Sequence, residues 1–384
     1  MIIHPRRVRT RSIIATAMLL GCSHSDAFVT DSANVPPSGT GADVRLTFNS
    51  EQDYWPAWTQ DGQGILYAYA NPGIPANPQH RCVGILPAAG GTRLWQFCDD
   101  RAVRSDTVSS FTGFALATDG RLLYAEAVAP RSSSLVPRVT LFVIDTAHPL
   151  VRTELLSLPV APGSPITWLS ELTWTGPGSF MALGQQFGTG VHCAPPCAAP
   201  PDSTFANWGG VVAGTIAGGR ATLSVVPGTD SATGYSLAEG GASIVFIRRD
   251  DGRLYKVPVG GGTPLVIATV SQDELGGVSC RGSTCVVATN PMSLFYGGSL
   301  TSGQVFPALR QGPHDLVGIS LTTGLTQVLK SMGTAANAQI VMTPVISPAS
   351  GDVVAQVGGT VWGHLQTFLG VSNADLHLYP ALVP

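Results

Sequence analysis

The sequence predicts an all-β chain, and three observations lead to this prediction. Glycine and proline are frequent, with 45 and 29 copies in 384 residues, so turns interrupt the chain throughout. Short stretches rich in Val, Leu and Thr alternate with these turns, and no stretch shows helical periodicity over any length. Asp-Gly pairs stand before apolar runs at Asp61-Gly62 and Asp119-Gly120, which is typical of tight β-hairpins.

The first hairpin carries the clearest motif. It consists of Leu46-Thr47, Asp53, Pro56-Ala57-Trp58, Asp61-Gly62 and Ile65-Leu66-Tyr67. This motif resembles the repeat of TolB-like (WD40-like, PD40) six-bladed β-propellers, although a glutamine stands where the family has its second proline. The resemblance implies that residues 44–384 form a single six-bladed propeller with four antiparallel strands in each blade. Seven blades are the alternative.

Further copies of this unit follow in outline. Their inner strands are expected near residues 56, 114, 172, 235, 277 and 345, and insertions in loops account for the unequal steps. Hairpin turns are expected at Asp119-Gly120, Gly176-Pro177-Gly178, Glu239-Gly240-Gly241, Arg281–Thr284 and Ser350-Gly351-Asp352. The sixth copy is one outer strand short. The N-terminal strand Val44–Phe48 is expected to supply it, which would close the ring and remove an open sheet edge.

The first 21 residues are typical of a signal peptide. Arginines 6, 7, 9 and 11 precede the apolar run Ile13–Leu20, which is too short to span a membrane. The following Leu19-Leu20-Gly21-Cys22 resembles the lipobox of bacterial lipoproteins, which implies acylation of Cys22; an ordinary secretory signal is the alternative. Residues 22–43 are rich in Ser, Pro and Gly and are expected to form a flexible tether. The predicted location is extracytoplasmic: a membrane-anchored lipoprotein of the periplasm or the outer membrane.

The net charge argues against a nucleic-acid partner. Loss of the signal peptide removes four of 21 basic residues and none of 24 acidic ones, which leaves the mature chain with a formal charge of −7. Phosphate binding needs clustered basic side chains, and Lys256 and Lys330 are the only lysines. We expect a monomer whose partners are the membrane, through Cys22, and a protein, peptide or glycan of the cell envelope.

Six cysteines remain beyond Cys22, and they are predicted to be disulfide-bonded. They fall into three local pairs, although the sequence alone allows fifteen connectivities: Cys82 and Cys98, Cys193 and Cys197, and Cys280 and Cys285. An oxidising compartment favours three disulfides. The alternative at the middle pair is a metal site with His192, since Cys-x3-Cys fits zinc spacing, but a fourth ligand is missing nearby. No cofactor and no metal are predicted.

No catalytic motif stands out in the sequence. The Gly-x-Ser-x-Gly elbow of hydrolases is absent, and the histidines are scattered. The predicted binding site is therefore an acidic rim at the channel mouth, built from the loops that lead into the inner strands. Its residues are Gln52, Asp53, Tyr54, Asp106, Glu171, Asp230, Asp273 and Glu274. An equally weighted interpretation is that Asp53 and its counterparts only cap turns.

Two functions are compatible with such a rim. The leading hypothesis is a non-enzymatic, lipid-anchored module that binds or scaffolds a protein, a peptide or an envelope glycan. The alternative is a channel-centred enzyme of the lyase, lactonase or glycan hydrolase type, which uses carboxylates with or without a divalent metal. The fold by itself does not decide between them.

Overall fold

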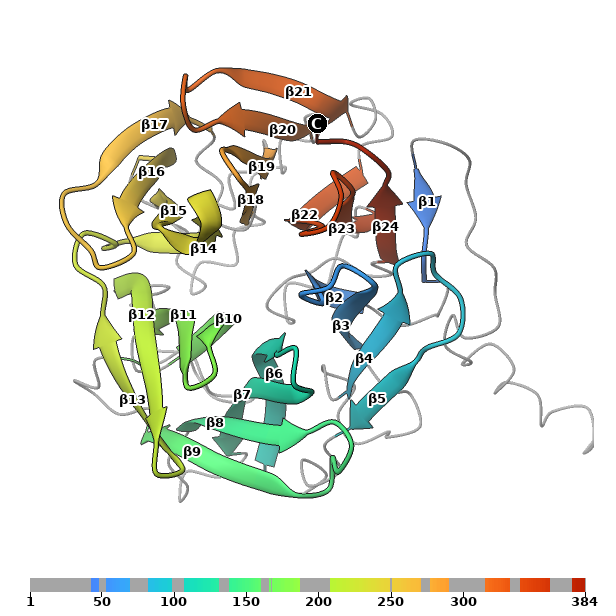
Figure 1. The fold of residues 1–384 in the computed structure, drawn as a ribbon, viewed down its shortest axis with the longest axis vertical. Helices are drawn as coiled ribbons and strands as arrows, with labels where there is room; N and C mark the ends of the chain where they lie inside the picture. Colours follow the sequence, from blue (N-terminus) through green and yellow to red (C-terminus); the bar gives the residue numbers. More distant parts are fainter. Residues whose placement is uncertain are drawn as a thin grey trace, which may run out of the picture.

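The chain forms six four-stranded antiparallel sheets arranged in a ring, and it is therefore a six-bladed β-propeller (Figure 1). The prediction of an all-β, six-bladed fold is confirmed. The computed structural model describes residues 43–47, 53–69, 82–98, 107–130, 138–159, 166, 168–186, 208–248, 251–270, 277–289, 315–331, 339–359 and 375–383. These residues contain no α-helix, and so none that could cross a membrane.

In each of the first three blades the chain runs from the innermost strand to the outermost. Blade 1 contains β2 (Asp53–Trp58), β3 (Gly64–Tyr69), β4 (Cys82–Pro87) and β5 (Trp95–Cys98). Blade 2 contains β6 (Thr107–Leu116), β7 (Arg121–Pro130), β8 (Arg138–Asp145) and β9 (Arg152–Pro159). Blade 3 contains β10 (Trp168–Gly176), β11 (Ser179–Gln186), β12 (Trp208–Ala217) and β13 (Arg220–Val225).

The last three blades repeat this order, with one exception in blade 6. Blade 4 contains β14 (Ala232–Ala238), the 3-10 turn η4 (Glu239–Gly241), β15 (Ser243–Arg248), β16 (Arg253–Pro258) and β17 (Leu265–Thr269). Blade 5 contains β18 (Val278–Arg281), β19 (Thr284–Thr289), β20 (Asp315–Ser320) and β21 (Thr326–Ser331). Blade 6 contains β22 (Gln339–Ile346), β23 (Val353–Gly359), β24 (Asp375–Tyr379) and the N-terminal β1 (Val44–Arg45).

The N-terminal strand closes the ring, as the sequence predicted. Strand β1 pairs antiparallel with β24, and Val44 lies opposite Leu378. The guanidinium of Arg45 and the carboxylate of Asp375 form an ion pair at 2.7 Å. Beyond the strand, the hydroxyl of Thr47 accepts a hydrogen bond from the backbone amide of Leu376 at 2.8 Å. The two ends of the chain are thereby joined in one sheet, so blade 6 has no missing strand.

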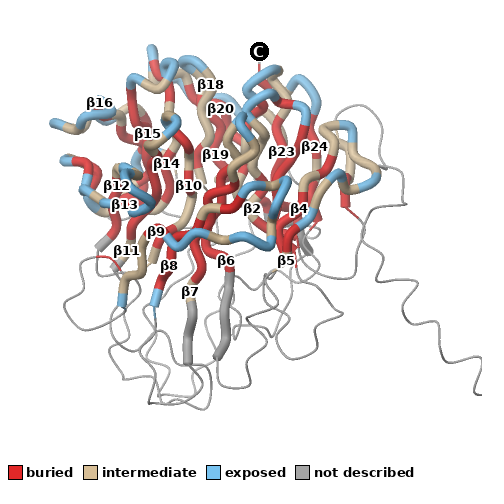
Figure 2. The backbone as a smooth tube through the Cα atoms, turned by 60° about the horizontal axis from the view of Figure 1, so that its bottom comes forward, coloured by how far each residue is buried: buried red, intermediate tan, exposed pale blue. Residues whose placement is uncertain are grey.

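The core consists of the apolar layers between neighbouring blades. Side chains alternate along each strand, so a strand buried on both faces contributes to two layers. In β23, Val353 and Ala355 pack toward blade 5, whereas Val354 packs toward blade 1. This arrangement explains why the second strands are almost continuously apolar and why buried residues fill the interior of the ring in Figure 2.

The two ends of the propeller differ in their connections. Short turns join the first strand of a blade to its second, for example Thr59–Gln63 in blade 1 and Ala117–Gly120 in blade 2. Because the strands are antiparallel, these turns all lie at one end of the ring, here called the turn end. The inner strands begin at the opposite end, here called the loop end, where longer stretches of sequence connect the second and third strands of every blade except blade 4.

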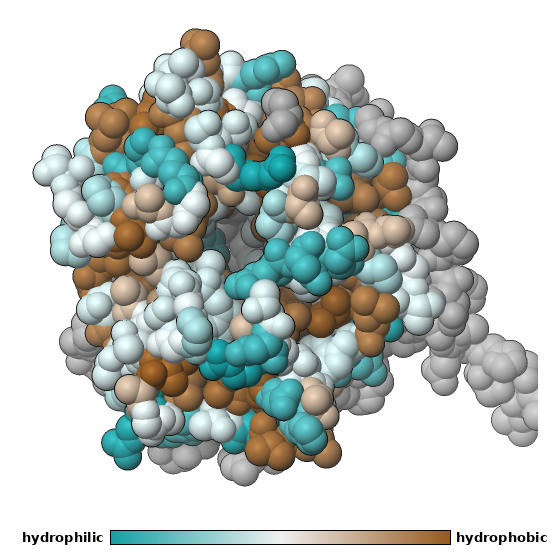
Figure 3. Space-filling model, viewed as in Figure 1, coloured by the Kyte–Doolittle hydropathy of each residue, from teal (hydrophilic) through white to brown (hydrophobic). Residues whose placement is uncertain are grey.

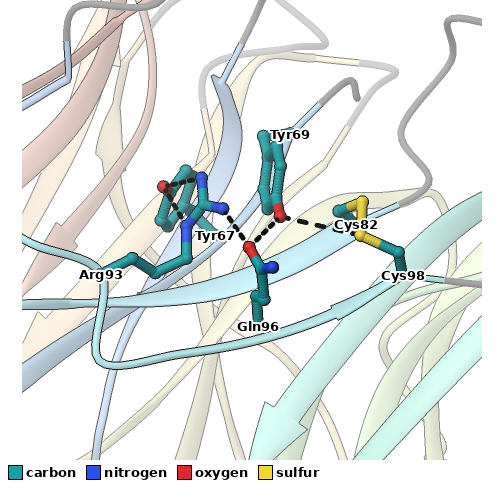
Figure 4. Close-up of a disulfide and its surroundings, with 6 residues drawn as sticks. All are labelled: Tyr67, Tyr69, Cys82, Arg93, Gln96 and Cys98. Atoms are coloured by element: carbon teal, nitrogen blue, oxygen red, sulfur yellow. Dashed lines mark hydrogen bonds between the residues drawn. A yellow bond between two sulfur atoms is a disulfide. The ribbon is translucent and has the colours of Figure 1, made fainter. Parts of the chain in front are cut away.

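Two disulfides are present among the described residues, and both join neighbouring strands. Cys280 lies opposite Cys285 across the hairpin of β18 and β19, and Cys82 lies opposite Cys98 between β4 and β5. Figure 4 shows the second disulfide beside Tyr69, whose hydroxyl lies 3.7 Å from the sulfur of Cys98. The predicted pairings of these four cysteines are confirmed. Cys193 and Cys197 lie outside the described residues.

A cationic side chain stabilises the sheet next to this disulfide. The guanidinium of Arg93 lies 3.7 Å from the ring centroid of Tyr69 and donates two hydrogen bonds to the hydroxyl of Tyr67. It also donates to the side-chain oxygen of Gln96 at 2.6 Å. Gly84 leaves room for this arrangement, because a β-carbon there would lie 2.7 Å from Nε of Arg93. The outermost strand of blade 1 is thereby fastened by both a covalent bond and a cation–π contact.

Candidate functional site

The inner strands surround the channel, and five of the six carry a β-bulge. Figure 3 shows that the face of the propeller is hollowed at its centre, where Figure 1 places these strands. Register shifts occur in β2, β6, β10, β14 and β22, and β10 has two of them. A bulge redirects a side chain and is common near active sites.

Three of these bulges hold a residue other than glycine in the left-handed region of the backbone. They are Trp55 at φ 51°, Glu171 at φ 48° and Thr343 at φ 46°. A side chain in this conformation is strained by about 1–3 kcal/mol, and such strain concentrates at functional sites. Glu171 is the only one of the three that carries an ionisable group, so it is the first candidate for chemistry.

Glu171 reaches from blade 3 across to blade 4. Its Oε2 accepts a hydrogen bond from the backbone amide of Tyr235 on β14 at 2.9 Å. Its Oε1 lies beside Gly234, where a β-carbon would be 3.4 Å from that oxygen. The carboxyl group is therefore placed at the junction of two inner strands.

Burial changes the acidity of this carboxyl group. Loss of hydration raises the pKa of Glu171 to about 7, and the hydrogen bond from the amide of Tyr235 opposes the shift. Protein atoms enclose the group, yet the residue keeps an intermediate solvent accessibility, as expected for a side chain on the wall of a narrow channel. Near neutral pH the protonated and ionised forms are both populated, which is the property a proton-transferring residue needs.

A hydrogen bond from the backbone amide of one inner strand to a side chain of its neighbour also occurs at two other junctions among the described residues, where a serine hydroxyl is the acceptor. The amide of Cys280 donates to the hydroxyl of Ser236 at 2.9 Å, between blades 4 and 5. The amide of Ile346 donates to the hydroxyl of Ser279 at 2.9 Å, between blades 5 and 6. A serine is sufficient to join two blades, so the carboxyl group of Glu171 exceeds the structural requirement.

The structure separates the residues that the sequence grouped as a rim. Asp53 is fully buried at the start of β2, and Tyr54 is buried in the layer between blades 1 and 2 with Leu66. Asp230 is exposed in the turn before β14. Gln52, Asp106, Asp273 and Glu274 lie outside the described residues, so their predicted binding role stays a prediction.

The sequence did not point to Tyr235 or to the bulges, although it contained a signal for them. The tripeptide Thr-Gly-aromatic occurs at Thr112-Gly113-Phe114 and again at Thr233-Gly234-Tyr235, each time within an inner strand. A glycine inside a strand often marks a bulge or a close approach of two backbones. The repeated tripeptide therefore indicates two bulges at equivalent places in blades 2 and 4.

Two tryptophans on the inner strands form hydrogen bonds to the neighbouring blade. Nε1 of Trp174 donates to the carbonyl of Ala115 in blade 2, and Nε1 of Trp58 donates to the carbonyl of Val345 in blade 6, both at 3.0 Å. Both side chains therefore have a structural role at the junctions between blades. Within the described ranges, no three His, Cys, Asp or Glu side chains converge in a way that could hold a metal ion.

No protein-family model matches the chain, and no curated protein does either. Several solved propellers resemble it in shape. A gluconolactonase from Xanthomonas campestris is 14% identical and has a TM-score of 0.47, over 91% of this chain and 96% of that one. An oligogalacturonate lyase from Vibrio parahaemolyticus is 11% identical with a TM-score of 0.45, over 90% and 95%. The calcium-binding protein regucalcin from Agrobacterium tumefaciens is 13% identical with a TM-score of 0.46, over 87% and 94%.

These comparisons correct the leading functional hypothesis. A non-enzymatic binding or scaffolding module was expected, but the propellers of this size and shape include a gluconolactonase and an oligogalacturonate lyase. The enzymatic alternative is taken up below as a proposal. Identities of 11–14% and TM-scores of 0.45–0.47 assign no reaction to this chain, since one fold hosts many activities. The chemistry proposed below therefore rests on the channel residues of this chain.

Proposed function

We propose that the protein is an enzyme whose reaction takes place at the wall of the central channel, with Glu171 as the general base. The observation that carries the proposal is a carboxyl group with a pKa of about 7, on a strained bulge, within reach of solvent. A general base is most effective when its pKa lies near the working pH. An ordinary surface glutamate, with a pKa near 4.5, would be a much weaker base.

The surroundings of Glu171 favour a reaction that needs one base. Burial and the amide of Tyr235 account for its pKa shift, and no charged side chain among the described residues contributes. Glycan hydrolysis normally uses two carboxyl groups about 5 to 9.5 Å apart, so it is the least supported of the three enzymatic classes. Lactone hydrolysis and β-elimination each begin with the removal of one proton, and they form the proposed class.

In lactone hydrolysis the carboxylate of Glu171 removes a proton from water, and the water oxygen bonds to the carbonyl carbon. The bond between that carbon and the ring oxygen then breaks. The ring oxygen takes the proton from Glu171, which leaves a hydroxy acid and regenerates the carboxylate. In β-elimination the same carboxylate removes a proton from the carbon next to a carboxyl group, a carbon–carbon double bond forms, and the bond between the next carbon and the leaving oxygen breaks. The leaving oxygen takes the proton from Glu171, which regenerates the carboxylate.

The test compares the wild type with Glu171→Gln in two assays. Acid release from a panel of sugar lactones measures hydrolysis, and ultraviolet absorbance measures unsaturated products from uronic-acid oligosaccharides. The amide that replaces the carboxyl group in this variant keeps the shape of the side chain but cannot accept a proton. We expect turnover by the wild type that rises with pH to a plateau above about pH 7, and a loss of about 100-fold or more in the variant.

Ser279→Ala is the matched control, because it removes a hydrogen bond between two other inner strands, those of blades 5 and 6. It should retain the wild-type rate. The proposal is wrong if Glu171→Gln retains the wild-type rate, or if the wild type turns over neither class of substrate.

We further propose that the chain is a TolB-like lipoprotein held at the membrane by an acylated Cys22, outside the cytoplasm. The basic and apolar N-terminal segments support this proposal, and so do the two disulfides, which persist in oxidising compartments. Mass spectrometry of the native protein from membranes should find acyl chains on Cys22, and Cys22→Ser should release the protein from the membrane. An unmodified Cys22 in the native protein would contradict the proposal.

A further inference from the structure

We infer that Thr112 and Gly113, which belong to blade 2, are positioning residues for Glu171 in blade 3. The inference rests on the proposed role of Glu171 as a base, and it adds residues that lie 58 or more positions away in the sequence. It is carried by two contacts between the bulge of β6 and the bulge of β10.

The first contact is a buried hydrogen bond. Oγ1 of Thr112 donates to the carbonyl oxygen of Leu169 at 2.5 Å, and both residues are almost completely buried. Leu169 lies two residues before Glu171, on the same strand. A buried hydrogen bond at this distance fixes the backbone that leads into the bulge.

The second contact is a close approach of two backbones. A β-carbon on Gly113 would lie 3.0 Å from the amide nitrogen of Glu171 and 3.0 Å from Cα of Ser170. Backbone atoms cannot move aside as the end of a flexible side chain can. The absence of a side chain at Gly113 therefore lets the bulge of β10 lie against the bulge of β6.

Blade 4 holds the other end of the same residue. The amide of Tyr235 donates to the carboxyl group, whereas Thr112 and Gly113 fix the backbone. Glu171 is thus held from both neighbouring blades: blade 2 contacts its left-handed backbone, and blade 4 contacts its carboxyl group. A shift of β10 away from β6 would move the carboxyl group relative to both its hydrogen-bond donor and the protein atoms that dehydrate it.

The pKa of Glu171 is therefore a direct readout of its position, and it does not depend on any substrate. Burial raises this pKa, so a displacement that admits water should lower it toward its ordinary value. The experiment is a pH titration of the full-length protein labelled with 13C at the glutamate carboxyl groups, in which the signal missing from Glu171→Gln identifies Glu171.

Thr112→Val removes the hydroxyl but keeps the volume, and Thr112→Ser keeps the hydroxyl. We expect Thr112→Val to lower the pKa of Glu171 by about one unit and to move the rising limb of the pH–rate profile by the same amount. Thr112→Ser should restore the wild-type value. Gly113→Ala should shift the pKa in the same direction, and Thr112→Val decides the question if Gly113→Ala does not fold.

Ser279→Ala is again the control, because it removes a hydrogen bond of the same kind between blades 5 and 6. The inference is overturned if folded Thr112→Val keeps the wild-type pKa, or if Ser279→Ala lowers it as much. These outcomes are independent of the proposed reaction, which fails instead when Glu171→Gln leaves turnover unchanged.

Discussion

Neighbouring inner strands of this propeller are joined by hydrogen bonds to two kinds of acceptor, a serine hydroxyl and a carboxyl group. Between blades 5 and 6, the hydroxyl of Ser279 accepts a hydrogen bond from a backbone amide, and this hydroxyl is neutral at every pH of interest. Between blades 3 and 4, the carboxyl group of Glu171 accepts a hydrogen bond from a backbone amide at the same distance of 2.9 Å. The hydrogen bonds are alike in length and in location, but only one acceptor can ionise.

The difference shows what a structural role would require and what it would not. A serine costs little to bury, because its hydroxyl is uncharged and finds partners easily. The ionised form of a buried glutamate is destabilised by the loss of hydration, so the side chain keeps its proton up to a higher pH. The pKa of Glu171 near 7 reflects this effect. A carboxyl group kept at this cost, on a strained residue, agrees with the proposed role of Glu171 as a base.

The largest effect is expected from shortening the carboxyl side chain. Glu171→Asp keeps the charge but withdraws the oxygen from the amide of Tyr235 by about one carbon–carbon bond. Because misplacement of a catalytic group by about 1 Å costs about 100-fold, the rate should fall by that factor while circular dichroism shows an unchanged fold. A rate within a factor of about three of the wild type would show that position is unimportant.

The second effect concerns stability and its dependence on pH. The pKa of Glu171 is about 7 in the folded state against 4.5 ordinarily, so between these pH values the folded state holds a proton that the unfolded chain releases. The free energy of unfolding therefore falls as pH rises through this window. Glu171→Gln lacks this penalty and should be more stable than the wild type by about 2 kcal/mol above about pH 7, after allowance for partial exposure.

Urea unfolding of the two proteins at about pH 4 and about pH 8 measures this difference. The two curves should converge at the lower pH, where Glu171 is protonated in both the folded and the unfolded state. A difference that is the same at both pH values would show that Glu171 has an ordinary pKa.

The third effect concerns the two junctions at which a serine hydroxyl is the acceptor, whose contribution to stability should not depend on pH. Ser236→Ala and Ser279→Ala each leave a backbone amide without its acceptor, which should cost about 1 kcal/mol in the free energy of unfolding. Since a hydroxyl does not titrate, this cost should be the same at about pH 5 and about pH 8. A marked pH dependence in either variant would erase the distinction between the two kinds of junction.

The smallest effect is expected where the ring closes. Trp58→Phe removes the hydrogen bond from Nε1 to the carbonyl of Val345 and keeps most of the aromatic surface. Thermal unfolding should show a loss of about 0.5–1 kcal/mol and no change in the pKa of Glu171. A larger loss would mean that the junction of blades 6 and 1 depends on this bond more than the serine junctions depend on theirs.

Much of the fold could be predicted from local patterns. Asp-Gly turns and alternating apolar residues identified hairpins such as Trp58–Ile65, and the copies of the unit gave six blades. The shortage of one strand in the last copy predicted the pairing of β1 with β24. Two of the three predicted disulfides lie among the described residues, and both are formed because their cysteines are near neighbours on adjacent strands.

The site was predicted only as a set of polar residues. Glu171 was one of eight rim candidates, and nothing in its sequence neighbourhood distinguished it from Asp53 or Asp230. The structure buries Asp53 completely, exposes Asp230 in a turn and leaves Glu171 partly exposed on the inner strand of blade 3. Burial depends on which strands lie side by side, and a strand's own sequence contains little of that information.

The sequence by itself determined that this chain is all-β, where its hairpins turn and how its ends meet, because turn chemistry and alternation act over a few residues. Only the tertiary structure decided that the pKa of Glu171 is raised to about 7. That shift is caused by the dehydration that arises where blades 2, 3 and 4 meet, at residues far apart in the chain.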